Sequence, residues 1–152
     1  MTRIVNIRPG DPRDPAATTL LQASHDLMCA LFPDESNHFL SIDALTGEDT
    51  CFFIAELDAK PAGCAALLLK DGYGELKSMF VDPGARGAKI GAKLLDRIEN
   101  EARTRNLPTL RLETGDELKA AQRLYLSHGF KLRAPFGDYN DDPRSLYMEK
   151  PL

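Results

Sequence analysis

The segment Val81-Asp82-Pro83-Gly84-Ala85-Arg86-Gly87-Ala88-Lys89-Ile90-Gly91 joins a predicted strand to a predicted helix and decides the fold class. The strand ends at Val81, a loop of small residues follows, and we expect the helix to begin at about Lys89. The free N–H groups of the first helical turn and the helix dipole favour an anion. Gly87 and Gly91 would let a ligand approach the backbone, and basic side chains add positive charge. The alternative is an ordinary strand-to-helix turn with solvated basic residues.

This segment lacks the motifs of nucleotide-binding loops. Gly87 and Gly91 are too close together for the Walker spacing, and Ala92 stands where that motif continues with Lys and Ser or Thr. The glycine pattern of dinucleotide-binding folds is also missing. A nucleotide-binding regulatory domain is therefore the weakest interpretation.

Upstream, the spacing of apolar residues predicts two helices and four strands. The expected elements are a strand at Arg3–Arg8, a helix from Pro15 to before Pro33, a short helix at Phe39–Leu45, and strands at Cys51–Leu57, Ala62–Leu69 and Glu75–Val81. The last three strands are separated by short turns, which is typical of antiparallel neighbours.

Downstream, the clearest helix carries an apolar stripe and ends at Asn106-Leu107-Pro108. The stripe consists of Ile90, Leu94, Leu95, Ile98 and Ala102. We then expect a strand at Thr109–Thr114, a helix at Lys119–His128 closed by Gly129, and strands at Phe130–Arg133 and Ser145–Lys150. This order predicts one α/β domain over residues 1–152 with a central mixed sheet.

Composition excludes several classes of protein. The 152 residues carry 19 basic and 23 acidic side chains, a net charge of −4, which argues against an extended nucleic-acid footprint. The longest apolar run, Ala62–Leu69, is far shorter than the ~20 residues that span a bilayer, and the first residues lack a signal peptide. The three cysteines show no Cys-x-x-Cys spacing, so we expect no disulfide framework and no metal site. The expectation is a cytoplasmic protein without nucleic-acid or membrane partners.

Two motifs resemble a known family. Residues 86–91 followed by Leu94-Leu95 resemble the acetyl-CoA loop of the GNAT superfamily of N-acetyltransferases, whose signature is Arg/Gln-x-x-Gly-x-Gly/Ala. The pattern Ala121-x-x-Leu124-Tyr125-x-x-x-Gly129-Phe130 resembles the second signature of that family. The element order also fits from Ile4 to Met148, within a bacterial branch whose acceptors are mostly unassigned.

The resemblance implies a mixed, mostly antiparallel sheet flanked by helices, and direct transfer of acetyl from acetyl-CoA to the amine of a small molecule or peptide. It leaves a homodimer open. Two departures support a rival, a catalytically inactive CoA-binding sensor or interaction module. Lys89 replaces the first signature glycine, and Leu118 replaces an Asn that contacts the cofactor in many members.

The resemblance also implies roles for individual residues. Backbone groups of Met79 and Val81, with Phe80 between them, would bind the pantetheine arm. The residues that would surround the pyrophosphate are Arg86, Gly87, Ala88, Lys89, Ile90 and Gly91. Tyr125 would protonate the leaving thiolate; the alternative for Tyr125 is a core aromatic residue.

The amine acceptor needs a base, because an alkyl ammonium has a pKa of ~10 and no free lone pair. Glu75 is the first choice, since it matches the catalytic glutamate of histone-modifying members of the family. Alternation places Glu75, Lys77, Met79 and Val81 on one face, where Lys77 would favour an ionised Glu75. The alternatives are a surface carboxylate paired with Lys77, Glu113 as the base, or a water chain.

Two loops, residues 33–38 and 135–143, are expected to receive the acceptor. Their carboxylates, which would attract a cationic amine, are Asp34, Glu35, Asp138, Asp141 and Asp142. His38 alone is expected to be a surface or capping residue. Cys51 and Cys64 are expected in the core, and Cys29 shows no His partner at a spacing that suggests a covalent relay.

Overall fold

The computed structural model of the chain describes residues 3–85 and 87–152. Its strands are β1 (Val5–Pro9), β2 (Thr50–Leu57), β3 (Lys60–Lys70), β4 (Tyr73–Val81), β5 (Thr109–Gly115), β6 (Lys131–Arg133) and β7 (Ser145–Pro151). Its α-helices are α1 (Pro15–Leu31), α2 (Ile90–Thr104) and α3 (Lys119–Ser127), and its short 3₁₀ helices are η1 (Asp34–Ser36), η2 (Asp43–Thr46) and η3 (Pro83–Ala85). Of these, η1 and η3 have no counterpart among the predicted elements.

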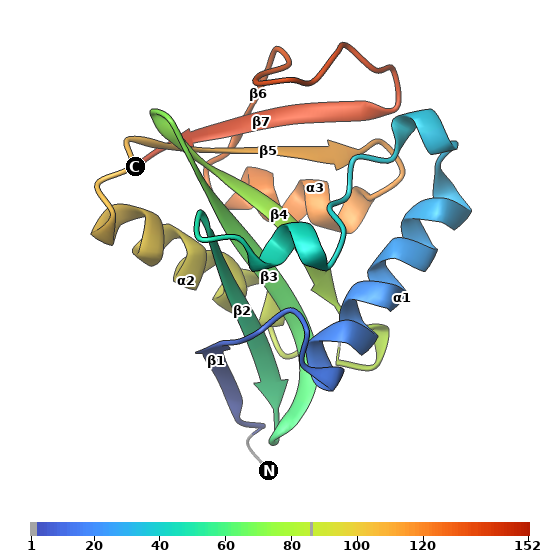
Figure 1. Cartoon of the computed structure of the whole chain (residues 1–152), viewed down its shortest axis with the longest axis vertical. Coiled ribbons are helices and arrows are strands. Elements are labelled where there is room, and N and C mark those ends of the chain that lie inside the picture. Colours follow the sequence, from blue (N-terminus) through green and yellow to red (C-terminus); the bar gives the residue numbers. More distant parts are fainter. Residues whose placement is uncertain (1–2, 86) are drawn as a thin grey trace.

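The strands form one sheet in the order β1-β2-β3-β4-β5-β7-β6 (Figure 1). All the neighbouring strands described are antiparallel except β4 and β5, which pair in parallel only through Gly74 with Leu110 and Glu75 with Arg111. Beyond these two pairs, β4 and β5 separate toward their carboxyl ends. The predicted mixed, mostly antiparallel sheet is confirmed, and its one parallel junction opens the sheet at its centre.

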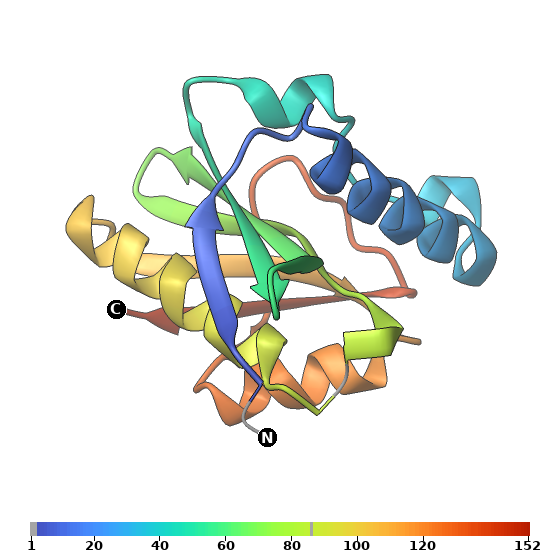
Figure 2. The same ribbon diagram turned by 90° about the horizontal axis from the view of Figure 1, so that it is seen from below.

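Helices cover both faces of the sheet. Figure 2 shows α1 on one side of the sheet and α2 and α3 on the other. The apolar stripe of α2 is buried, and its Leu94, Leu95 and Ile98 have no exposed surface. On the other face Leu20 and Leu21 of α1 pack with Phe52 and Ile54 of β2. The apolar face of α1 packs into one core, and the apolar faces of α2 and α3 pack together into the other.

A β-bulge at Ser78 corrects the prediction that Glu75, Lys77, Met79 and Val81 share one face. Lys77 pairs with Ala66 and Phe80 pairs with Cys64, so three steps along β4 match two steps along β3. Ser78 has φ of 55°, the left-handed conformation that such an extra residue adopts. The alternation therefore reverses.

The side chains separate accordingly. Glu75, Lys77 and Phe80 are paired with β3 residues that face α1, whereas Met79 and Val81 pack against the core under α2 and α3.

Two further segments differ from, or refine, the predictions. The short helix predicted at Phe39–Leu45 is confirmed only at its end: Asp43–Thr46 forms the 3₁₀ helix η2, and residues 39–42 are not helical. Leu40 and Ile42, spaced two apart, both pack on the α1 side of the core, a spacing that suits extended chain. Gly129 does close α3 with φ of +91°, as predicted.

Candidate active site

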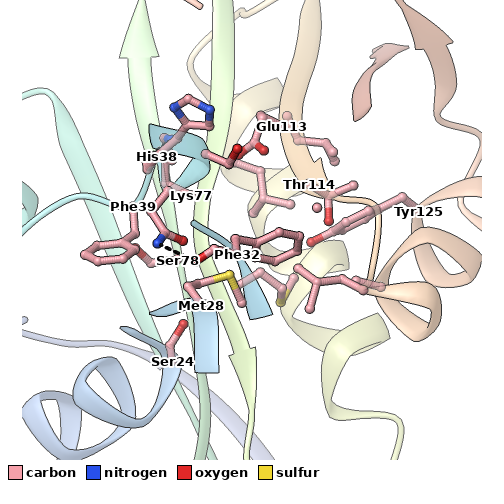
Figure 3. A pocket seen from close by; sticks show the side chains of 18 residues that line it. Ser24, Met28, Phe32, His38, Phe39, Lys77, Ser78, Glu113, Thr114 and Tyr125 are labelled. Carbon is pink, nitrogen blue, oxygen red and sulfur yellow. Dashed lines mark hydrogen bonds between the residues drawn. The ribbon is translucent and has the colours of Figure 1, made fainter. Parts of the chain in front are cut away.

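A narrow cavity of about 110 Å³, here called the cleft, lies where β4 and β5 separate. Side chains from α1, β4, β5 and α3 line it (Figure 3). The lining residues that matter below are Met28, Phe32, Lys77, Ser78, Met79, Leu112, Glu113, Thr114, Leu118 and Tyr125. The cleft therefore depends on the bulge in β4 and on the short β4–β5 pairing.

Tyr125 reaches into the cleft from α3 (Figure 3). The end of its helix fixes it: the Phe130 N–H donates to the Tyr125 carbonyl and the Gly129 N–H to the Leu126 carbonyl, a Schellman motif. The Phe130 ring packs edge-on against the Tyr125 ring, with 5.8 Å between centroids. Burial, and secondly the nearby Glu113 carboxylate, raise the pKa of Tyr125 well above its ordinary value. The hydroxyl is therefore protonated at neutral pH and able to donate a proton.

Glu113 lines the same cleft from β5. The Ser145 hydroxyl of β7 donates a 2.8 Å hydrogen bond to its carboxylate. Burial is the largest influence and raises the pKa of Glu113, although Ser145 and Lys77 partly oppose it. A glutamate whose pKa is raised is better matched to accept a proton near neutral pH.

Glu75 is buried, but it faces a neighbouring cavity rather than the cleft. We call this cavity of about 360 Å³ the side pocket; its lining comprises His38, Phe39, Leu40, Leu68, Lys70, Tyr73, Glu75, Lys77, Gly137, Asp138 and Tyr139. The Tyr139 hydroxyl donates a 2.6 Å hydrogen bond to Glu75, and the Lys77 ammonium lies 3.7 Å from the same oxygen. The predicted proximity of Lys77 to Glu75 is confirmed.

Lys77 links the two cavities, since it lines both. Its ammonium donates a 2.7 Å hydrogen bond to the His38 carbonyl. Burial lowers the pKa of Lys77, against the opposing effects of Glu75 and Glu113. Its ammonium therefore lies within electrostatic reach of both carboxylates that the sequence offered as bases.

The N-terminus of α2 is open to an anion. Lys89 occupies the N-cap position with φ of 59° and ψ of 34°. No described side chain forms a capping hydrogen bond there, and no acidic residue lies in the first turn of the helix. The first N–H groups are therefore available, as the sequence indicated. The left-handed backbone at Lys89 shows that this position has the conformation glycine adopts most easily. Arg86 lies outside the described residues.

The two glycines of this turn have different surroundings. A Cβ at Gly87, whose φ is +88°, would meet no described atom within 4 Å. A Cβ at Gly91 would lie 3.0 Å from the Leu124 side chain, so Gly91 also allows α2 to pack against α3. Ile90 is buried, whereas Ala88 packs partly against the core.

Beyond Glu75, the described part of β4 pairs with β3 on one edge and with no strand on the other. Met79, Phe80 and Val81 thus present one free strand edge next to the cleft and the α2 N-terminus. A linear polar chain could pair with such an edge as an added strand.

Sequence reasoning missed two features of the cleft. His38 is not a simple surface residue: its side chain is 23% exposed, it lines the cleft and the side pocket, and its Nε2 lies 3.6 Å from Asp142. Gly115 is also essential, because a Cβ there would collide with the Phe32 ring. Both depend on contacts between distant segments, which leave no local pattern in the sequence.

The two acidic loops do meet. They line a cavity of about 620 Å³, the acidic cavity, whose charged lining residues are Glu35, Asp138, Asp141, Asp142 and Arg144, with His38 beside them. Asp34 is not among the residues that line it. Asp142 joins the two loops: it accepts hydrogen bonds from the nearby Arg144 N–H and from the Ser36 hydroxyl of the other loop.

The remaining predicted positions behave as follows. Cys64 is fully buried, and burial raises its pKa to about 12, while Cys51 is partly buried and Cys29 is exposed. Residues 3–85 and 87–152 contain no group of three or more His, Cys, Asp or Glu side chains arranged to hold a metal ion. No helix in this part of the chain is long and apolar enough to cross a membrane.

Comparison with known proteins gives consistent matches. Residues 17–130 match the Acetyltransferase (GNAT) family. The chain is 43% identical over 150 residues to the IAA acetyltransferase of Azospirillum brasilense, covering 97% of this chain and 98% of that protein. A crystal structure from Klebsiella pneumoniae, named as an acyl-CoA N-acyltransferase, has a TM-score of 0.83 at 34% identity over 98% of both chains. A GNAT acetyltransferase from Elizabethkingia anophelis with acetyl-CoA bound shares the fold, with a TM-score of 0.70 at 19% identity over 97% of this chain and 98% of that one.

Proposed function

Because the chain belongs to the GNAT family of acetyltransferases and is an N-acetyltransferase, we propose that it transfers acetyl directly from acetyl-CoA to the amine of a small molecule or peptide bound in the cleft. One observation carries this proposal: the cleft holds a protonated tyrosine and a glutamate of raised pKa together, and the uncapped N-terminus of α2 packs against Leu124, the neighbour of that tyrosine in α3.

The residues around the α2 N-terminus fit the acyl donor. The N–H groups at the start of α2 and the Lys89 ammonium would bind its pyrophosphate, and the open edge of β4 at Met79–Val81 would bind its pantetheine arm. The space around Gly87 is open, because a Cβ placed there would meet no described atom within 4 Å, and this supports close approach of the pyrophosphate to the backbone. Once bound, acetyl-CoA supplies an activated acetyl thioester and a thiol leaving group.

Glu113 is the proposed base. It shares the cleft with Tyr125, and its raised pKa suits removal of a proton from the acceptor ammonium. Glu75, the first choice from the sequence, lines the side pocket rather than the cleft, is paired with Lys77 and already accepts a hydrogen bond from the Tyr139 hydroxyl. Glu75 is therefore the second candidate for the base.

Tyr125 is the proposed acid. Its hydroxyl lies in the cleft, and its raised pKa keeps it protonated until a thiolate forms beside it. No described side chain forms a hydrogen bond with this hydroxyl, so its proton is not committed elsewhere.

The acceptor class covers many amines. IAA is a separate candidate acceptor, because the Azospirillum brasilense relative is named as an IAA acetyltransferase. The free thiols support a reducing, cytoplasmic compartment. The rival function is a CoA-binding sensor, favoured by the apolar Leu118 at the mouth of the cleft.

The test is a thiol-release assay with purified protein, acetyl-CoA and a panel of primary amines, peptides and IAA, with the acetylated product identified by its mass. We expect free CoA to appear in step with an acetylated acceptor. Tight binding of acetyl-CoA without release in the presence of any acceptor would instead identify a sensor.

A further inference from the structure

Three cavities meet at His38, which lines the cleft, the side pocket and the acidic cavity. Phe39 and Lys77 also line both the cleft and the side pocket. The cavities therefore share these side chains as walls, and an acceptor whose amine lies beside Glu113 in the cleft has both neighbouring cavities next to it. The linings of those cavities decide which extension is favoured.

The lining of the side pocket is about as polar as it is apolar, and its apolar part includes three aromatic rings. Phe39, Leu40, Leu68, Tyr73 and Tyr139 supply that apolar and aromatic part. The pocket's volume of about 360 Å³ lies at the lower end of the range for small-molecule sites, which suits a single ring rather than a large ligand.

Neighbouring groups hold these rings in place before any ligand arrives. Phe39 stacks on His25 with 4.2 Å between centroids and 15° between planes, yet its side chain is still 39% exposed. The Arg111 guanidinium lies 4.4 Å above the Tyr73 ring. Tyr139 is held through its hydrogen bond to Glu75. A preordered aromatic wall costs little to organise when a ligand binds.

The charges of the side pocket cancel. Glu75 is paired with Lys77, and the remaining charged lining residues are Lys70 and Asp138, one of each sign. The pocket therefore offers no net attraction to a cationic tail, in contrast to the acidic cavity. In the acidic cavity, Asp142 already accepts hydrogen bonds from the Arg144 N–H and the Ser36 hydroxyl.

We propose that the side pocket binds the non-reacting part of the acceptor, and that this part is a planar aromatic ring joined by a short linker to the amine. The enzyme then prefers arylalkylamines to aliphatic amines and polyamines. This inference rests on the proposed acetyltransferase function and names the substrate class of the same site. Aromatic contacts add selectivity beyond apolar area, because ring faces and edges attract each other.

The experiment compares four amines in the thiol-release assay: 2-phenylethylamine, 2-cyclohexylethylamine, butylamine and 1,4-diaminobutane. We expect kcat/KM for 2-phenylethylamine to exceed that for butylamine by ~10-fold, equivalent to ~1.4 kcal/mol. The cyclohexyl compound tests whether planarity matters, and we expect it to fall between these two. The diamine should be no better than butylamine.

Phe39→Leu and Tyr73→Leu should each reduce the 2-phenylethylamine to butylamine ratio by ~2–10-fold, because each removes one aromatic partner. Leu132→Ala is the matched control: Leu132 is a 63% exposed apolar residue on β6 that lines none of the three cavities. It should leave the ratio unchanged.

Equal kcat/KM values for all four amines, or preference for the diamine, would overturn the side-pocket proposal and leave the acetyltransferase function standing. Absence of thiol release with every amine would overturn the proposed function instead. In that case calorimetric titration of the CoA-bound protein with the same amines decides the side-pocket proposal: selective binding of 2-phenylethylamine supports it, and equal binding overturns it.

Discussion

At the residue scale, burial shifts the pKa values of Tyr125 and Glu113 in one direction and that of Lys77 in the other, yet it favours the neutral form of all three. It raises the pKa values of Tyr125 and Glu113 and lowers that of Lys77. In each case the neutral form is favoured, because the cleft and its surroundings desolvate charge. A neutral tyrosine and an only weakly acidic glutamate are suited to moving protons in both directions during acyl transfer.

Tyr125→Phe should lower kcat by ~10²-fold or more, with little change in the affinity for acetyl-CoA. The reason is that the hydroxyl is needed only when the thiolate leaves, while the ring that packs on Phe130 is retained. Steady-state kinetics and calorimetry measure the two quantities. A correctly folded Tyr125→Phe variant with wild-type turnover would assign Tyr125 to the core.

Glu113→Gln should lower kcat at neutral pH by ~10²–10⁴-fold with an aliphatic amine, because the amide keeps the shape but not the basicity. Wild-type activity should fall as the pH decreases through the raised pKa of Glu113, since the protonated carboxyl cannot act as a base. This fall on the acidic side of the pH profile, the acidic limb, should disappear in the Glu113→Gln variant. The activity of the variant should partly recover at high pH as free amine becomes abundant.

Glu75→Gln is the matched comparison, because it makes the same chemical change in the adjoining side pocket. We expect a smaller loss of kcat and a wild-type acidic limb. A larger loss at Glu75 than at Glu113 would move the base to Glu75, and equal small losses would favour a water chain.

At the scale of elements, the bulge in β4 separates the side chains that face α1 from those that face α2 and α3, and so separates Glu75, the second candidate for the base, from the proposed cofactor edge. It directs Glu75 and Lys77 toward the α1 face and Met79 and Val81 toward α2 and α3. Without the extra residue at Ser78, alternation would place all four on one face.

Ser78→Val should destabilise the protein by ~1–3 kcal/mol and weaken acetyl-CoA binding, because a β-branched residue is strongly disfavoured at a positive φ. Ser78→Gly, which accepts that conformation, should keep both properties near wild type. Urea denaturation and calorimetry provide the readouts. Equal stability and affinity in the two variants would show that the backbone at position 78 does not control the cofactor edge.

A second prediction at this scale concerns acetyl-CoA binding at the N-terminus of α2. Lys89→Glu should weaken acetyl-CoA binding at least ~10-fold, an effect reduced by high salt because it is electrostatic. Lys131→Glu, the same charge reversal on the exposed edge strand β6, is the control and should bind normally. If both variants lose affinity equally, overall charge rather than this turn governs binding.

These elements also show what the sequence could predict. Residues 90–102 and the Tyr125-to-Phe130 pattern predicted α2 and the end of α3, because local periodicity and Gly129 at a left-handed position determine them. The bulge at Ser78 could not be predicted, since it appears only in the register with β3. The role of His38 was missed for a similar reason: it depends on cavities formed by segments far apart in the chain.

On the scale of the whole molecule, the fold brings the carboxyl end of β4, the start of α2 and the side chains of β5 and α3 to one opening in the sheet. The net charge of −4 does not describe this opening, where a helix N-terminus and Lys89 face the solvent. The parallel junction between β4 and β5 is what allows two halves of an otherwise antiparallel sheet to separate there.

The structure of the protein bound to a non-transferable acetyl-CoA analogue tests the central claim most directly. The account predicts pyrophosphate against the first turn of α2, the pantetheine arm along Met79–Val81, and the sulfur within hydrogen-bonding reach, ~3 Å, of the Tyr125 hydroxyl in the cleft. An analogue bound outside the opening between β4 and β5, or with its sulfur far from Tyr125, would contradict it.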